Sequence, residues 1–297
     1  MKIKAHPPLL LDKKQDYIRI FGVRRSGNHA ISDFIANAYD GRILYLDQCR
    51  LPTSPLERFS GYKFDNKVFS LIDKEVSTSR RLYNQRDSVS AIENHIKICD
   101  GVIAFFEEQV FADLNIARSG FFSGRSKNII VIRSFSNWLA SAYNHIFIYN
   151  PQENYSIKTL GHLCELSHSW VNHANRLLSI DDSQRVMCVI FDEFISNPLA
   201  REKLTAWLGL PSTHFPSHDA SRFGRGSSFS GYRQQDLLNS KNLTDRISLI
   251  KDDVNFVRCL RAILEDPDVR EAVQNTFPDD LLKSEKLIDA AVAAKMI

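Results

Sequence analysis

The chain has 297 residues, 43% of them hydrophobic and 25% charged, which is enough for one large domain or two modest ones. A formal net charge of only +3 gives no indication of a nucleic-acid partner. The five cysteines are scattered and lack C-x-x-C spacing, so neither a zinc site nor a disulfide framework is indicated. No apolar run is long enough to span a membrane, and we expect a cytoplasmic protein.

Short apolar strands alternate with helical patterns along the chain, which predicts an α/β fold with a central, mainly parallel sheet flanked by helices. The predicted strands are 17–23, 42–46, 89–93, 128–133 and 185–191. The predicted helices are 30–38, 137–146, 159–178 and 198–209. Residues 50–87 are polar and are interpreted as an insertion or loops with room for one short helix. Residues 240–297 look helical, and we expect 1–297 to form a single domain.

The first strand leads through Gly22-x-x-x-x-Gly27 into a helix, which is the arrangement of a phosphate-binding P-loop. A nucleoside triphosphatase needs Lys and then Ser or Thr after this pattern, but this chain has Asn28 and His29. The pattern predicts a phosphate ester bound without a metal. Arg24 and Arg25 suit such an anion, although a solvated turn with two surface arginines is the alternative.

Two further segments flank predicted strands. Arg133 ends a buried strand and Ser141 lies two turns along the next helix, so both could converge on one anion. Taken alone, a capping region in which Arg133 pairs with a nearby acid is the more usual interpretation. Asp192 and Glu193 follow another apolar strand and can be read as a metal-binding Walker B motif. Without the Walker lysine, we favour a structural role near a helix N-terminus.

Two candidate regions are ambiguous on chemistry alone. The Gly- and Ser-rich segment 223–231, with Arg225, Gly226 and Ser227, suits a loop that closes over a phosphate, or an ordinary surface loop. Glu93 and His95 end the predicted strand 89–93, where either could act as general base for an acceptor hydroxyl. A solvated or capping role is the alternative for both.

Taken together, these segments resemble the sulfotransferases that use 3′-phosphoadenosine 5′-phosphosulfate (PAPS). The stretch 25–29 is similar to that family's 5′-phosphosulfate loop, and Arg133 with Ser141 matches the spacing of its 3′-phosphate-binding Arg and Ser. The stretch 191–198 is similar to its Tyr-Glu-Asp-Leu-x-x-Asn-Pro segment, and 224–226 falls at its Arg-Lys-Gly loop, with Gly224 in place of the first Arg. The segments RRSGNHAI and GSSFSG are more similar to a bacterial sulfotransferase-like branch of the family than to its cytosolic drug-metabolising enzymes.

The resemblance implies a P-loop NTPase-like sulfotransferase fold and metal-independent transfer from PAPS to an acceptor hydroxyl on a small molecule or a glycan, leaving 3′,5′-adenosine bisphosphate. It implies that the nucleotide is bound by Arg24, Arg25, Ser26, Gly27, Asn28, His29, Arg133, Ser141, Arg225, Gly226 and Ser227. Arg25 would also assist catalysis, and Glu93 would be the base with His95 as second choice. The rival functions are a P-loop kinase or ATPase-like phosphotransferase and a non-catalytic nucleotide-binding protein. The oligomeric state is not predicted.

Overall fold

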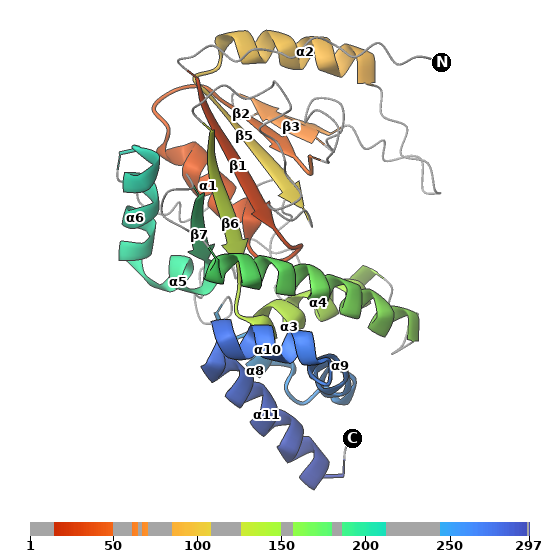
Figure 1. Cartoon of the computed structure of the whole chain (residues 1–297). Coiled ribbons are helices and arrows are strands. Elements are labelled where there is room, and N and C mark those ends of the chain that lie inside the picture. The colour runs from red at the N-terminus through yellow and green to blue at the C-terminus, as the bar shows by residue number, and fades with distance from the viewer. Residues whose placement is uncertain are drawn as a thin grey trace.

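A computed structural model of the protein describes residues 15–49, 61–64, 67–70, 85–107, 126–149, 157–179, 186–211, 244–295 and 297. Within these residues seven strands form one sheet, in the order β4-β3-β2-β5-β1-β6-β7 (Figure 1). The strands are β1 (Asp16–Gly22), β2 (Ile43–Asp47), β3 (Gly61–Phe64), β4 (Lys67–Ser70), β5 (Gly101–Glu107), β6 (Ser126–Ile132) and β7 (Val186–Ile190).

The five strands from β2 to β7 in the sheet order are parallel, and β3 and β4 add an antiparallel edge. The prediction of a mainly parallel sheet is therefore confirmed. Because parallel strands end at the same edge, the segments after β1, β2, β5, β6 and β7 leave the sheet together. This edge positions the candidate site.

Helices α1 (Asn28–Ala38), α5 (Phe191–Ser196) and α6 (Pro198–Leu208) pack on one face of the sheet, where Ile20 and Phe105 are fully buried. Helix α2 (Gln85–Ile98) contributes Ile92 to the core of the opposite face. Pro198 starts α6 and Gly209, with φ 73°, caps it, as the sequence predicts.

A third core lies beyond the carboxyl ends of the strands. It is built by α3 (Phe135–Tyr149), α4 (Ile157–Leu178), α9 (Val254–Leu264), α10 (Pro267–Thr276) and α11 (Pro278–Ala293), with the short α8 (Ile247–Ile250) beside them. Trp138 and Trp170 are its largest fully buried side chains, with ring centroids 6.4 Å apart. The helical C-terminal part predicted from the sequence is therefore present and packs against α3 and α4 (Figure 1).

The prediction of a strand at 89–93 is wrong, because these residues lie within α2. Ile92 and Ile96 are buried whereas Asn94 between them is exposed, which fits one face of a helix and not a strand, in which all three would share a side. Strand β5 was not predicted from the sequence, although GVIAFFE is an apolar run of strand length. Residues 61–64 and 67–70 form a hairpin of two strands inside the segment interpreted as loops.

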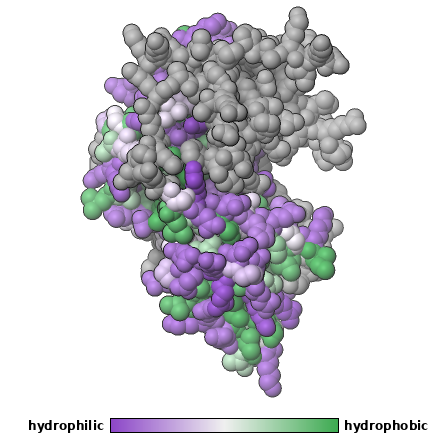
Figure 2. All heavy atoms as spheres, viewed as in Figure 1, coloured by the Kyte–Doolittle hydropathy of each residue, from purple (hydrophilic) through white to green (hydrophobic). Residues whose placement is uncertain are grey.

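None of the described helices is both long and apolar enough to cross a membrane. Figure 2 shows mainly hydrophilic residues on the visible face of the C-terminal helices, with small hydrophobic areas between them. All five cysteines lie among the described residues, and none forms a disulfide.

Candidate functional site

The loop between β1 and α1 is folded tightly around its two glycines. Gly27 has φ 95°, and a Cβ atom there would lie 2.0 Å from the ring of Phe191. A Cβ at Gly22 would lie 2.0 Å from the Asn28 Oδ1 atom. Arg25 also has a positive φ, of 74°, which costs a non-glycine residue about 1–2 kcal/mol. The Gly22-x-x-x-x-Gly27 pattern therefore reflects close backbone approaches, and the strain at Arg25 points to a functional position.

Asn28 stands where a triphosphatase has its lysine, and here it holds the loop together. Its Nδ2 donates to the Val23 carbonyl at 3.0 Å, and the side chain is buried. Ser26 is fully buried, yet its hydroxyl has no hydrogen-bond partner within the described residues. A buried hydroxyl of this kind is expected to bond a ligand, since unsatisfied polar groups are rare. The loop thus keeps donors for an anion and lacks the triphosphate-binding lysine.

Three arginines from distant parts of the chain meet beside this loop. Ser141, fully buried on α3, accepts hydrogen bonds from Arg25 Nε at 3.3 Å and from Arg246 Nη1. Arg133, at the end of β6, pairs with Asp192 Oδ1 at 3.5 Å. We call Arg25, Arg133, Ser141 and Arg246 the arginine cluster. Its three arginines come from the loop after β1, from the end of β6 and from the segment just before α8.

The guanidiniums of the arginine cluster repel one another. Burial lowers the pKa of Arg133 to about 10, with Asp192 opposing this shift and Arg25 adding to it. Burial, Arg133 and Arg25 together lower the pKa of Arg246 well below its usual value, and Asp192 only partly offsets them. Like charges packed this closely out of water repel each other. A bound anion would relieve the repulsion.

The positive potential extends to α3. Burial, followed by Arg25 and Arg24, lowers the pKa of His145 to about 4. The charges of Arg24 and Arg25 therefore also lower the pKa of a residue on α3. Arg24 itself is held by Trp138, whose Nε1 donates to the Arg24 carbonyl at 2.9 Å, and its guanidinium pairs with Glu107 at 3.4 Å.

Asp192 has the structural role that the sequence favoured over a Walker B motif. It lies in the first turn of α5, and its Oδ2 accepts the Ser134 backbone N–H at 2.8 Å. Its other oxygen faces Arg133, whose guanidinium also lies 5.0 Å from the centre of the Phe191 ring. In the described part of the chain, no group of three or more His, Cys, Asp or Glu side chains is arranged to hold a metal.

Glu93 and His95 do not lie at the edge that carries the loop, so that predicted placement is wrong. Both are on α2, which crosses the opposite end of the sheet in Figure 1. The end of α2 is tied to the start of β1, because Gln15 Nε2 donates to the Cys99 carbonyl at 2.8 Å. His95 stacks on Phe64 with ring centroids 4.1 Å apart. Helix geometry, in place of the expected strand, moves both residues away from the arginine cluster.

The remaining predicted residues divide into two groups. His29 lies in the first turn of α1, beside Tyr45, so it belongs to the loop edge. Arg225, Gly226 and Ser227 lie outside the described residues, and their predicted roles stay predictions.

Arg246 was missed by the sequence analysis. It is 105 residues from Ser141, and no motif surrounds it. Its backbone N–H donates to Asn137 Oδ1 at 2.8 Å, and Asn137 Nδ2 bonds the Thr244 carbonyl, so α3 holds this segment in place. The one local signal is an arginine directly before the buried Ile247, a cation next to an apolar helix start.

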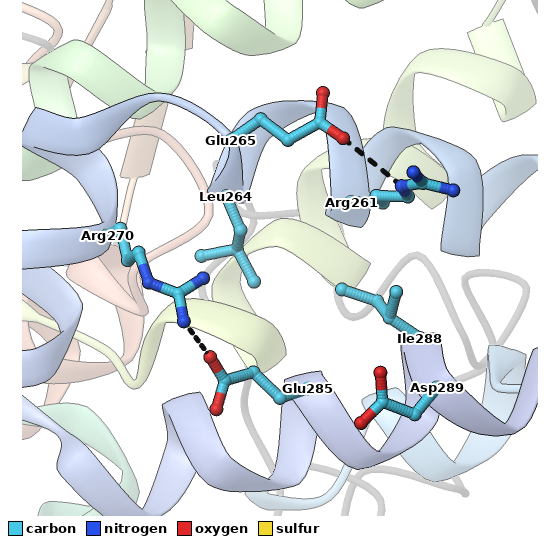
Figure 3. Close-up of a pocket in the computed structure, with 7 residues that line it drawn as sticks. All are labelled: Arg261, Leu264, Glu265, Arg270, Glu285, Ile288 and Asp289. Carbon is cyan, nitrogen blue, oxygen red and sulfur yellow. Dashed lines mark hydrogen bonds and ion pairs between the residues drawn. The ribbon is translucent and has the colours of Figure 1, made fainter. Parts of the chain in front are cut away.

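A pocket of about 440 Å³ lies among the C-terminal helices, away from these residues (Figure 3). Its two arginines already have partners, because Arg261 pairs with Glu265 at 3.1 Å and Arg270 pairs with Glu285. Asp289 adds a further negative charge to its wall. The pocket therefore lacks the excess positive charge that distinguishes the arginine cluster.

A sequence profile of the sulfotransferase domain family matches residues 15–262. Among solved structures, mouse sulfotransferase SULT7A1 complexed with PAP is similar over 90% of each chain, with 12% identity and a TM-score of 0.47. The sulfotransferase domain of the Synechococcus PCC 7002 olefin synthase is similar over 81% of this chain and 92% of its own, with 11% identity and a TM-score of 0.42. No curated relative matches the sequence. The sequence profile, which covers most of the chain, carries the family assignment.

Proposed function

This chain belongs to the sulfotransferase domain family, and from that premise we propose that it transfers a sulfuryl group from PAPS to an acceptor hydroxyl. The transfer is an in-line displacement that uses arginines and backbone amides in place of a metal ion. It releases 3′,5′-adenosine bisphosphate (PAP). Such reactions are catalysed mainly by positioning and by electrostatic stabilisation of the transferred group and the leaving phosphate.

The observation that carries this proposal is the convergence of the arginine cluster beside a P-loop without lysine. Arg133 and Arg246 are buried beside the half-buried Arg25, and the repulsion among these guanidiniums favours a ligand that brings negative charge. PAPS carries phosphate groups at both ends of its ribose, and it therefore suits a loop and an arginine cluster that adjoin each other. Arg25 belongs to both, through its bond to Ser141.

The site residues are assigned to the two ends of the nucleotide according to their positions. We assign the backbone amides of 26–29 and the Arg25 guanidinium to the phosphosulfate end, with the Ser26 hydroxyl as an added donor. Arg133, Ser141 and Arg246 hold the 3′-phosphate. Arg225, Gly226 and Ser227 stay assigned to the same phosphate on the resemblance alone. Arg24, paired with Glu107, supports the loop from outside.

The rival phosphotransferase needs residues that are otherwise engaged here. Asn28, at the lysine position, bonds the Val23 carbonyl, and Asp192 pairs with Arg133 and the Ser134 amide. Neither is arranged to hold a triphosphate with Mg²⁺. A non-catalytic nucleotide-binding protein would bind PAP equally well, and only a transfer assay with labelled PAPS separates it from an enzyme.

Several finer predictions stay predictions. The prediction of a glycan acceptor depended on Glu93 as the base. The position of Glu93 on α2 does not support that role. The bacterial branch and the cytoplasmic location rest on the sequence alone. The acceptor is accordingly proposed only as a hydroxyl-bearing molecule.

A thermal-shift panel tests the nucleotide preference. We expect PAP at about 100 times its Kd to raise the Tm by roughly 5 °C, because binding at that excess stabilises the folded state by about 2.7 kcal/mol. ATP with Mg²⁺ should give a clearly smaller shift. A larger shift with Mg-ATP than with PAP would favour the phosphotransferase.

A further inference from the structure

Tyr45, Asp47 and His29 lie at the same edge of the sheet as the loop. Tyr45 and Asp47 are two residues apart on β2, so both face the side that α1 covers. Asp47 is the last residue of β2, at the carboxyl edge. His29 follows Gly27 by two residues in the first turn of α1. The three side chains therefore converge beside the loop that we assign to the phosphosulfate.

The three side chains form a continuous hydrogen-bonded chain. The Tyr45 hydroxyl donates to Asp47 Oδ1 at 3.1 Å, and the same hydroxyl lies 3.2 Å from His29 Nδ1. His29 Nδ1 also lies 3.8 Å from Asp47 Oδ1. The Tyr45 and Asp47 side chains are buried, whereas the His29 side chain is 27% exposed. His29 is thus the accessible end of a buried carboxylate–tyrosine pair.

This chain of bonds fixes the proton on the imidazole. Burial, followed by the Asp47 and Asp33 carboxylates, raises the pKa of Tyr45 well above its usual value, so its hydroxyl keeps its proton. That proton points to Asp47, which leaves an oxygen lone pair toward His29. This geometry favours the tautomer in which Nδ1 donates to the Tyr45 oxygen and Nε2 carries the lone pair.

The Nε2 atom of His29 is available. Within the described ranges His29 makes its polar contacts only through Nδ1, and the ring edge packs against Phe105 with centroids 5.5 Å apart. A neutral imidazole with one nitrogen held by an acid network and the other open is the arrangement of a general base.

Among the residues that the structure describes, the other candidates for the base are engaged or lie elsewhere. Glu107, at the end of β5, pairs with Arg24. His145 has its pKa lowered to about 4 by burial and the loop arginines, which makes it a weak proton acceptor. Glu93 and His95 lie on α2, at the other end of the sheet.

We propose that His29 is the general base for the acceptor hydroxyl and that Tyr45 and Asp47 are positioning residues that hold it in the Nδ1–H form. This role deepens the proposed function and rests on it. The acceptor O–H proton passes to His29 Nε2 as the acceptor oxygen bonds to sulfur. The bond from sulfur to the bridging oxygen breaks, and its electron pair stays on the released PAP. Asp47 stabilises the imidazolium through Tyr45, and the proton then leaves to solvent.

The first test separates a base from a group that merely holds the nucleotide. His29→Gln keeps the size and a hydrogen-bond donor but cannot accept the proton. With labelled PAPS and a panel of phenols, alcohols and sugars, with water as background acceptor, we expect turnover at saturating PAPS to fall about 10²–10⁴-fold. PAP affinity by calorimetry should stay within about twofold. His162→Gln, an exposed histidine on α4, is the matched control.

The second test reads the proton directly and needs no acceptor. In protein with ¹⁵N-labelled histidine, long-range ¹H–¹⁵N spectra should show neutral His29 in the Nδ1–H form. Tyr45→Phe should abolish that preference in a folded protein. Tyr39→Phe removes a comparable Tyr–Asp bond, to Asp16 at 3.0 Å at the far end of the sheet, and should leave it intact.

Three results would overturn the proposal. They are wild-type turnover in His29→Gln, a loss of PAP affinity that accounts for the loss of turnover, or an Nε2–H form of His29. If the wild-type protein fails to bind PAP, the proposed function itself fails, and the base role falls with it. That outcome is recognisable because it appears before any substitution is made.

Discussion

Ser141 is the residue at which the two halves of the site meet. It has one hydroxyl, and two guanidiniums donate to it, from Arg25 in the first loop and from Arg246 in the C-terminal part. Neither arginine gains a full countercharge from this contact, since a hydroxyl is neutral. The arrangement is explained if both cations are held ready for an anion that arrives between them.

Arg246 gives the sharpest test at this scale. Its pKa is depressed by burial and by Arg133 and Arg25, so its charge opposes folding of the free protein. The substitution removes this unfavourable charge together with the hydrogen bond to Ser141, so we expect Arg246→Gln to leave the Tm of the free protein nearly unchanged. It should weaken PAP binding about 10- to 100-fold, which corresponds to one lost charge-assisted hydrogen bond. Calorimetry with PAP measures the affinity, and a thermal scan measures the Tm.

Arg261→Gln is the control for this substitution, because Arg261 is an exposed arginine that pairs with Glu265. It should change neither quantity. Arg246→Lys should restore part of the affinity, since the charge returns without the planar fork. An Arg246→Gln protein that folds and binds PAP as tightly as the wild type would remove Arg246 from the site.

At the scale of elements, local patterns predicted the loop and its strand well. The glycines at 22 and 27, with an apolar strand before and a periodic helix after, were enough to locate the turn. Arg133 and Ser141 could be predicted as partners from the sequence because they lie at one strand–helix junction. Arg246 could not be found in this way, because its neighbours in space are more than 100 residues away in sequence.

Helix α2 shows why the predicted base was misplaced. Val89–Glu93 has strand-forming residues, but Ile92 and Ile96 are buried while Asn94 is exposed, and a helix gives this pattern whereas a strand would place all three on one side. Because residues 89–93 are part of a helix, Glu93 and His95, the predicted bases, lie at the other end of the sheet from the arginine cluster. The Tyr45–Asp47–His29 contacts were not readable from the sequence, since strand β2 and helix α1 had to be placed side by side first.

The two glycines Gly27 and Gly161 offer a matched pair at this scale. Gly27→Ala forces a Cβ into the Phe191 ring at a positive φ, and we expect a loss of at least about 2 kcal/mol in unfolding free energy. Gly161→Ala adds a methyl group inside α4 that meets nothing within 4 Å, and it should stabilise the protein by about 0.5–1 kcal/mol. Denaturant unfolding of both variants measures the two changes. Equal effects would contradict the close packing of the loop.

At the scale of the whole molecule, the C-terminal helices complete the site. Asn137 on α3 holds the backbone of Arg246, and Ser136 on the same helix bonds Asp280 of α11. The carboxyl edge of the sheet therefore has a wall made of chain that follows the contacting residues of α3 by more than 100 residues. Helices α10 and α11 lie beyond the residues matched by the family profile, yet they pack against α4 and α9 and so support this wall.

The central claim is that the loop and the arginine cluster bind the two phosphate groups of one nucleotide without a metal. Titration calorimetry of the wild-type protein with PAP and with 5′-AMP, each in the presence of EDTA, tests it most directly. We predict that PAP binds at least about 100-fold more tightly, because the 3′-phosphate adds two or more hydrogen bonds to charged groups at about 1.5–3 kcal/mol each. Equal affinities for the two nucleotides, or PAP binding that is lost in EDTA, would contradict it.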